Sequence, residues 1–222
     1  LISCKPSENT TEVSNPEDVV LAKDTLKTIN ESPKLVVGIV VDQMRYDYLT
    51  RFWDRFGEDG FQRMINEGYN CKNNHYNYAP TKTGPGHASI FTGTSPKNHG
   101  IIANDWYDKF EKQMVYCAGD PSVTPLGTTS GAGKMSPHRM VTTTFADQNR
   151  LNTQFKGKTI GVSVKDRGAI LPAGHSANGA YWFEGGKNGN FISSSYYFDE
   201  LPAWGEKPKN EDLDSKDNSV VK

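Results

Sequence analysis

Thr83 stands in a stretch that could present a hydroxyl group as a nucleophile. It is followed by Gly84-Pro85-Gly86 and then by apolar residues and good helix formers, a pattern that predicts a tight turn with Thr83 in the first turn of a helix. The free amides and the positive dipole end of a helix favour a neighbouring anion, either an ionised hydroxyl or a phosphoryl group. The alternative is that Thr83 only caps the helix, as threonine often does.

Asp42 and Asn104 are candidates to join Thr83 in one site. Asp42 follows Leu35–Val41, a continuous apolar run that is typical of a parallel strand buried on both faces. Thr83 also follows a strand-like segment, residues 69–78, and open α/β sheets place their sites beyond the carboxyl ends of their strands. We therefore expect Asp42 and Thr83 to face one another, although Asp42 could equally cap the turn that follows it. Asn104 offers an amide in a loop that leads into a short predicted strand.

Lys165 and Arg167 are two cations one residue apart, directly after another apolar strand-like run, residues 158–164. Their position at the end of a predicted buried strand indicates an anion-binding role. A solvated turn is the alternative interpretation, and the local pattern does not choose between the two.

The remaining pattern predicts an α/β fold. Apolar residues at helical spacing over 46–67 predict two short helices whose aromatic face belongs to the core, with Gly68 ending the second. Residues 119–135 lack periodicity and predict an exposed loop. Ser136-Pro137 predicts the start of a helix that runs through Asn149, and residues 180–197 predict a hairpin with a Gly/Asn-rich loop.

Composition limits the classes of partner. The chain has 222 residues, 35% of them hydrophobic, which is enough to build a core, and its net charge of −1 gives no reason to expect nucleic acid as a partner. No run approaches the roughly 20 apolar residues of a membrane-spanning helix. Cys71 and Cys117 could pair in an oxidising compartment or stay free, and the sequence leaves this open.

The N-terminus predicts a lipid anchor. Leu1-Ile2-Ser3-Cys4 has the pattern of a bacterial lipobox, and residues 5–34 are polar and resemble a tether. We expect a chain attached to a membrane through a lipid on Cys4, in the bacterial cell envelope, either periplasmic or anchored to the outer membrane. A chance tetrapeptide is the alternative.

In combination, four motifs resemble the alkaline phosphatase superfamily. They are Val40–Arg45, Pro80–His87, His99–Tyr107 and Lys165–Arg167. The resemblance runs from about residue 35 to 204. Within the superfamily, the motifs most resemble the type I phosphodiesterase/nucleotide pyrophosphatase branch and its relative, the phosphate-irrepressible alkaline phosphatase of flavobacteria. It implies an α/β fold with an alkaline-phosphatase-like mixed sheet flanked by helices.

The resemblance also implies a site and a reaction. Two zinc ions are expected, with Asp42 as a ligand and Thr83 as both ligand and nucleophile, while Asn104 contacts a phosphoryl oxygen. The reaction would be hydrolysis of small-molecule phosphate monoesters through a phosphothreonine intermediate. Lys165 and Arg167 match the monoesterase branch, because a monoester carries one more negative charge than a diester.

Two other functions remain open at this point. One is a nucleotide pyrophosphatase or phosphodiesterase of the same superfamily. The other is a non-catalytic lipoprotein that binds phosphate esters through Thr83, Asn104, Lys165 and Arg167. A carbohydrate-binding lipoprotein, suggested by the aromatic content and the tether, is a weaker third possibility.

The chain departs from the superfamily in its zinc ligands. The later Asp and His ligands have no counterpart after Arg167, where His175 is the only histidine. Zinc usually takes four ligands, so Asp42 and Thr83 alone leave the site incomplete. The sequence therefore predicts residues 1–4 as the end of a signal peptide, 5–34 as a tether and 35–222 as the N-terminal part of a catalytic domain. On this interpretation the remaining zinc ligands lie beyond residue 222, and this part alone is inactive.

Overall fold

A computed structural model describes residues 33–185 and 189–202 and divides the chain into two compact units, Leu1–Val41 and Asp42–Lys222. The predicted lipobox with Cys4, nearly all of the predicted tether and the chain after residue 202 lie outside the described residues. The lipid anchor and the tether therefore stay predictions. Within the described ranges, no helix has both the length and the apolar character that crossing a membrane requires.

The predicted strand at Leu35–Val41 is wrong for the described part of the first unit. This run has no regular secondary structure, and all of its apolar side chains except the half-buried Val40 are exposed, with Leu35 77% and Ile39 75% accessible. Residues 69–78, the second predicted strand, also consist of turns and irregular chain, and Tyr69 is 92% exposed. The β-branched composition supplies only a preference, because a strand forms when a neighbour accepts and donates its backbone hydrogen bonds.

Short helices occupy residues 47–67, where the sequence predicts two. They are α2 (Asp47–Arg51), the 3₁₀ turn η2 (Trp53–Arg55), the irregular turn η3 (Glu58–Gln62) and α3 (Arg63–Glu67). Gly68 follows the last helix as predicted. None of the residues in these helices is buried, so the prediction that their aromatic face belongs to the core is wrong. Instead, Phe56 and Phe61 pack on each other, with ring centroids 5.1 Å apart.

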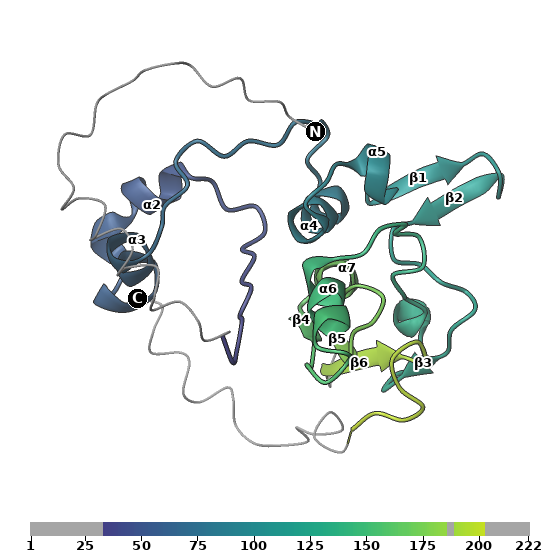
Figure 1. Cartoon of the computed structure of the whole chain (residues 1–222). Helices are drawn as coiled ribbons and strands as arrows, with labels where there is room; N and C mark the ends of the chain where they lie inside the picture. Colours follow the sequence, from purple (N-terminus) through teal and green to yellow (C-terminus); the bar gives the residue numbers. More distant parts are fainter. Residues whose placement is uncertain (1–32, 186–188, 203–222) are drawn as a thin grey trace, which may run out of the picture. The chain divides into compact units, whose positions relative to one another are not determined.

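A mixed sheet forms the base of the second unit (Figure 1). Its strands are β3 (Pro125–Leu126), β4 (Ile160–Ser163), β5 (Gly179–Glu184) and β6 (Asn190–Ser194), in the order β3-β6-β5-β4. Strand β4 is parallel to β5, and the other pairs are antiparallel. The predicted hairpin at residues 180–197 and the predicted mixed sheet are both confirmed.

Strand β4 is present where predicted, but it is not buried on both faces. Val162 is 61% exposed, because β4 is the last strand of the described sheet and only one of its faces is covered. That covered face carries Gly161, where an added Cβ would lie 2.2 Å from the carbonyl oxygen of Ala169. The glycine thus lets a helix approach the strand closely.

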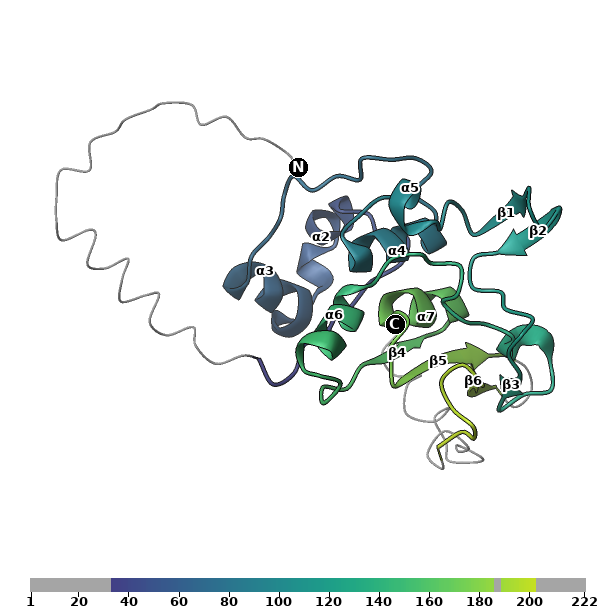
Figure 2. The same cartoon turned by 45° about the vertical axis from the view of Figure 1, so that its right-hand side comes forward.

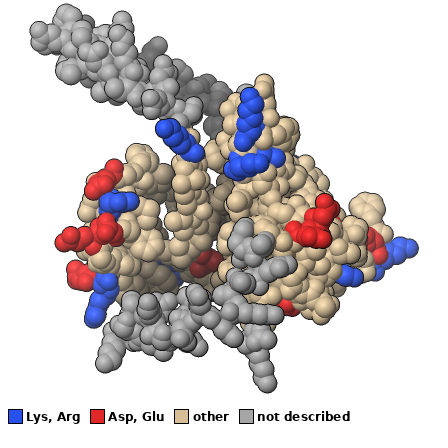
Figure 3. All heavy atoms as spheres, turned by 90° about the horizontal axis from the view of Figure 1, so that it is seen from below, with Lys and Arg blue, Asp and Glu red and all other residues tan. Residues whose placement is uncertain are grey.

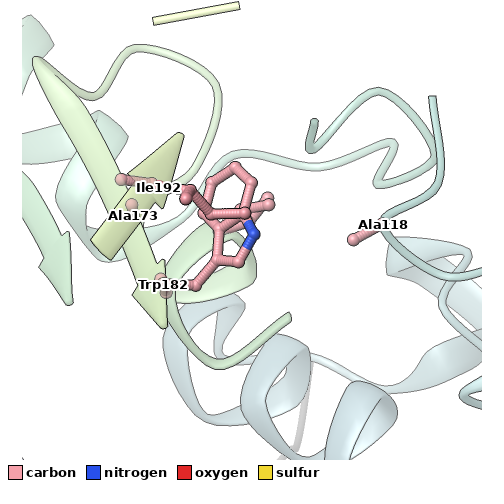
Figure 4. Packing of buried hydrophobic residues seen from close by; sticks show 7 residues of the cluster. Ala118, Ala173, Trp182 and Ile192 are labelled. Atoms are coloured by element: carbon pink, nitrogen blue, oxygen red, sulfur yellow. The ribbon is translucent and has the colours of Figure 1, made fainter. Parts of the chain in front are cut away.

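That helix, α7 (Asp166–Ala173), is the central layer of the second unit. It connects β4 to β5 and packs on both, and α4 (Thr83–Thr92) packs on α7, as the two views in Figure 1 and Figure 2 show. Both buried clusters draw on α7. One cluster faces the sheet and includes Trp182, Ile192 and Ala173 (Figure 4). The other faces α4 and joins Leu171 to Ala88 and Ile101.

The helix α6 (Phe145–Asn152) begins later than predicted. Thr144 is its N-cap and forms a capping box with Asp147, in which each side chain bonds the other residue's backbone N–H. Ser136, the predicted start, is fully buried and donates its hydroxyl to Asp120 instead. The prediction of an exposed loop over residues 119–135 is also wrong in part, because this segment contains β3, the turn η4 (Gly131–Gly133) and the buried Asp120.

The last elements lie between α4 and the sheet strands in sequence. The short helix α5 (Pro96–His99) precedes a hairpin of β1 (Asp105–Asp108) and β2 (Gln113–Tyr116). The predicted short strand after Asn104 is thereby confirmed as β1. On the face drawn in Figure 3, Lys and Arg side chains lie beside Asp and Glu side chains in some places and without them in others.

Candidate active site

Thr83 is the first residue of α4, as the sequence predicts. Lys82 takes the N-cap position and makes no side-chain capping bond, so the alternative of Thr83 as the N-cap does not hold. The Nδ1 atom of His87, one turn further on, donates to the Thr83 carbonyl at 2.8 Å. The helix ends at Gly93, whose φ of 67° lies in the left-handed region that glycine adopts readily. The backbone at Thr83 is therefore fixed by the helix itself and by the side chain of His87.

The Thr83 side chain faces Asp42. Thr83 Oγ1 donates to Asp42 Oδ2 at 3.3 Å, across 41 residues of chain. The sequence predicts this meeting from two strand ends, but neither strand is present. Asp42 lies in a turn beside Gln43, whose φ is 61°, so a bend of the chain brings the two residues together.

Asn104 is held in one orientation by α4. Its Oδ1 accepts from the backbone N–H of Gly84 at 2.7 Å, and its backbone carbonyl accepts from Cys117 N–H at 2.8 Å. Because Oδ1 is an acceptor here, the Nδ2 amino group is the free donor end, and it has no hydrogen bond among the described residues. Gly84 makes this contact possible, since an added Cβ would lie 3.1 Å from Asn104 Oδ1.

Lys165 and Arg167 lie at the N-terminus of α7 rather than in a solvated turn. Lys165 is the N-cap, and its exposed ammonium group makes no hydrogen bond or ion pair to any residue that the structure describes. Arg167 is half-buried, and its NH1 donates to Tyr116 Oη at 2.7 Å. Helix N-termini attract anions, so the two cations add to a favourable place for a phosphate group.

His87 connects the first turns of α4 and α7. Its Nδ1 bonds the Thr83 carbonyl, and its Nε2 would lie 3.8 Å from a Cβ added to Gly168. The nucleophile candidate and the cation candidates therefore start neighbouring helices. The sequence analysis did not identify His87 and Tyr116 as residues of the site. Both contact other segments of the chain, and no local sequence pattern indicates such contacts.

The free cysteines do not extend the site. Cys71 and Cys117 are both unpaired, the first exposed and the second buried, which answers the question that the sequence left open. Burial, with the nearby charge of Asp166 as a second cause, raises the pKa of Cys117 to about 12. A thiol with this pKa stays protonated near neutral pH, so Cys117 fills space behind Gly84 and is not a nucleophile.

The described residues do not by themselves form a metal site. Among them, no three His, Cys, Asp or Glu side chains are grouped closely enough to bind a metal ion. The fit of Asp42 and Thr83 to zinc can still be tested, because two oxygen ligands at about 2.0 Å from a tetrahedral zinc ion are about 3.3 Å apart. The observed separation of 3.3 Å between the hydroxyl and the carboxylate oxygens agrees with a shared zinc ion.

Comparison with known families assigns the chain to one of them. The Type I phosphodiesterase / nucleotide pyrophosphatase family matches residues 36–220. The chain therefore belongs to this family, and its mixed sheet flanked by helices is an alkaline-phosphatase-like fold.

Two relatives are especially similar in sequence. Alkaline phosphatase PafA from Elizabethkingia meningoseptica is 55% identical over 173 residues, which are 78% of this chain and 32% of PafA. Alkaline phosphatase PhoV from Synechococcus elongatus is 52% identical over 172 residues, or 78% of this chain and 31% of PhoV. The chain thus spans about a third of the length of these relatives.

Crystal structures of PafA match the fold. The wild-type structure gives a TM-score of 0.77 at 54% identity, covering 79% of this chain and 34% of PafA. A PafA variant with a substituted threonine, asparagine, lysine and arginine gives the same TM-score at 52% identity. These four residue types, in this order, are also those of Thr83, Asn104, Lys165 and Arg167 here.

Proposed function

We propose that the chain supplies the nucleophile and the phosphate-binding groups of a zinc-dependent phosphate monoester hydrolase. The observation that carries the proposal is the 3.3 Å contact between Thr83 Oγ1 and Asp42 Oδ2 at the start of α4. A threonine hydroxyl is a weak nucleophile unless a base or a cation activates it, and the Asp42 carboxylate is suited to hold such a cation. The alkaline phosphatase names of PafA and PhoV support the same reaction.

The metal requirement extends beyond the described residues. Bound zinc would supply Lewis-acid stabilisation of the ionised hydroxyl and of the leaving oxygen. Catalytic zinc keeps about three protein ligands, and this chain offers Asp42 and Thr83 toward one such ion. We propose two zinc ions whose remaining ligands come from sequence that corresponds to the unmatched two thirds of the relatives.

The residues of this chain have distinct tasks in the proposed reaction. Thr83 Oγ1 attacks phosphorus, the bond to the leaving alcohol breaks, and a phosphothreonine forms. Water then attacks the phosphothreonine, which releases inorganic phosphate and restores the hydroxyl of Thr83. The free Nδ2 of Asn104 is placed to donate to a non-bridging oxygen, because Gly84 fixes the other end of the amide.

Lys165 and Arg167 favour the monoester over the diester. A phosphate monoester carries one more negative charge at neutral pH, and two cations at the N-terminus of α7 would balance it. The name of the matching family keeps a nucleotide pyrophosphatase or phosphodiesterase as the second candidate. A diesterase would gain little from the two cations, so removing them separates the two functions.

The test compares an aryl phosphate monoester with a matched diester, using the full-length protein that also contains the proposed remaining zinc ligands. We expect monoester hydrolysis that a chelator abolishes and zinc restores, that Thr83→Ala eliminates and that Thr83→Ser retains in part. Acid-trapped enzyme should carry phosphate on Thr83 by mass spectrometry. Removing one charge-stabilising donor commonly costs about 100- to 1,000-fold, so Arg167→Ala should lower monoester kcat/KM on that order while sparing the diester.

Lys97→Ala is the matched control, because Lys97 is an exposed lysine in the last turn of α5. It should change neither activity. Dominant diester hydrolysis by the unsubstituted protein would favour the phosphodiesterase. Phosphate binding without turnover, even with zinc, would favour the non-catalytic binding protein.

A further inference from the structure

Tyr116 stands at the end of β2 and reaches the first turn of α7. Its hydroxyl donates to Asp166 Oδ1 at 2.5 Å and accepts from Arg167 NH1 at 2.7 Å. The Arg167 guanidinium carbon also lies 5.8 Å from the centre of the Tyr116 ring. One tyrosine thus contacts both of the first two residues of the helix across 50 residues of chain.

The two candidate cations are held very differently. Arg167 is half-buried, and its Nε is buried without a hydrogen-bond partner among the described residues. The Lys165 side chain is exposed. A guanidinium fixed at one nitrogen keeps its other donors pointed in one direction, which lowers the entropy cost when it binds an anion.

The Tyr116 hydroxyl keeps a defined polarity. Burial raises the pKa of Tyr116 far above its usual value, and the negative charge of Asp166 raises it further. The phenol therefore stays protonated and must donate its single proton to one acceptor, the Asp166 carboxylate. Its lone pair is left to accept from Arg167, so the chain of bonds from Arg167 to Tyr116 to Asp166 runs in one direction only.

The residue after Tyr116 connects the same strand end to the nucleophile's helix. Cys117 N–H donates to the Asn104 carbonyl at 2.8 Å, and Asn104 Oδ1 accepts from Gly84 N–H at 2.7 Å. Tyr116 and Cys117 therefore fix Arg167 and Asn104 from one short segment. Arg167 and Asn104, which would contact the same phosphoryl group, are therefore both positioned by this segment.

We propose that Tyr116 is a positioning residue that holds the Arg167 guanidinium in place for the phosphoryl group and thereby sets the preference for monoesters. The inference rests on the proposed function, because it gives Arg167 a reason to be fixed. Tyr116 itself touches no reacting atom. Its effect should therefore pass entirely through Arg167.

Tyr116→Phe in the full-length protein that also contains the proposed remaining zinc ligands removes the hydroxyl and keeps the ring. Tyr197→Phe is a matched control, because Tyr197 packs against the same buried cluster and its buried hydroxyl has no hydrogen-bond partner among the described residues. Displacing a binding group by about an ångström can cost about 100-fold, so monoester kcat/KM should fall by about 10- to 100-fold in Tyr116→Phe. Diester kcat/KM should change less than about threefold. The affinity for inorganic phosphate, measured by calorimetry, should fall with the monoester activity.

A double-mutant cycle decides whether the effect passes through Arg167. In an Arg167→Ala background, Tyr116→Phe should cause no further loss of monoester activity. A further loss of the same size, or equal losses for monoester and diester, would overturn the proposal. So would an unchanged monoester to diester ratio in Tyr116→Phe when Arg167→Ala does change that ratio.

The failure of the proposed function would give a different result. If Arg167→Ala itself leaves the monoester to diester ratio unchanged, Arg167 does not recognise the extra charge, and the proposed function fails first. Thermal unfolding of both phenylalanine variants separates folding from positioning. If Tyr116→Phe and Tyr197→Phe have the same melting temperature, the activity loss of Tyr116→Phe is not a loss of folded protein. A much lower melting temperature of Tyr116→Phe, together with equal activity losses on the monoester and the diester, would assign Tyr116 a structural role and overturn the proposal.

Discussion

Replacing Gly84 by alanine would test how tightly the start of α4 is packed against the site. An added Cβ would lie 3.1 Å from Asn104 Oδ1 and 3.2 Å from both the Ala103 carbonyl oxygen and Cys117 Sγ. Favourable contacts to carbon lie at about 3.5–4.0 Å, so all three neighbours must move. A Cβ added to Gly86, two residues later in the same helix, would have only the Tyr76 hydroxyl within 4 Å among the described residues, at 4.0 Å.

Comparing the alanine substitutions at Gly84 and Gly86 therefore separates the effect of helix propensity on stability from the effect of packing. Alanine is better than glycine in a helix by up to about 1 kcal/mol, and overpacking a tight site costs about 1–3 kcal/mol. Gly86→Ala should raise the free energy of unfolding by roughly 0.5–1 kcal/mol. Gly84→Ala should lower it by roughly 0–2 kcal/mol, because the packing cost exceeds the gain in propensity.

Urea unfolding followed by tryptophan fluorescence measures both changes, and steady-state hydrolysis of a phosphate monoester measures the effect on the site. Gly84→Ala should lower monoester kcat/KM in the full-length protein with the proposed remaining zinc ligands, because the contacted Asn104 amide has to shift. Gly86→Ala should leave it unchanged. If the two variants are equally stable, the close packing around Gly84 is refuted. If Gly84→Ala is destabilised but fully active, the tie between Gly84 and Asn104 does not govern the site.

Two further predictions concern buried polar groups of the second unit. Burial lowers the pKa of His99, which bonds Ser89 Oγ at 2.8 Å, so the folded ring binds a proton less readily than the unfolded ring, whose pKa is near 6.5. The free energy of unfolding should therefore fall as pH drops from 7 to 5, by at most about 1.4 kcal/mol per pH unit. If the free energy of unfolding has the same pH dependence in the unsubstituted protein and in His99→Gln, His99 is not the cause. The Asp147 carboxylate accepts from the N–H and hydroxyl of both Thr144 and Ser176, so Asp147→Asn should cost about 2–4 kcal/mol, and an unchanged melting temperature would contradict that account.

Local signals were sufficient where one segment makes its own structure. Thr83 before Gly-Pro-Gly predicted the start of α4, because this signal acts within the first turn of the helix. The hairpin of β5 and β6 was predicted for the same reason, since its strands are close in sequence. In each of these cases the partner groups are near neighbours along the chain.

Strands showed where local signals fail. The run at Leu35–Val41 and strand β4 have similar β-branched composition, and the sequence predicted a buried strand for both. Only β4 is a strand in the described structure, because β5 supplies its hydrogen-bond partners. Composition records a preference for extended backbone, whereas pairing depends on what another segment brings alongside.

Competition between partners explains the missed start of α6. The sequence analysis placed the start at Ser136-Pro137, whereas Thr144 is the N-cap in the structure. The Ser136 hydroxyl is used by Asp120, 16 residues earlier, while Thr144 and Asp147 bond each other's backbone. A capping side chain can serve only one partner well, and the sequence alone does not show which partner is near.

The arrangement of α7 bears on how substrate preference could change within this family. Its later residues Ile170 and Leu171 are fully buried in the two clusters, so the helix position is fixed by the core. Its first turn carries the candidate cations, of which Lys165 is exposed, and the Lys165 side chain makes no hydrogen bond or ion pair to a described residue. Replacing Lys165 would therefore alter the charge offered to a phosphate ester at little cost in stability, since surface substitutions usually change it by less than about 0.5 kcal/mol. Replacing Arg167 would remove the hydrogen bond that Arg167 donates to the Tyr116 hydroxyl in a half-buried place. On physical grounds the two cations should therefore not be equally free to vary.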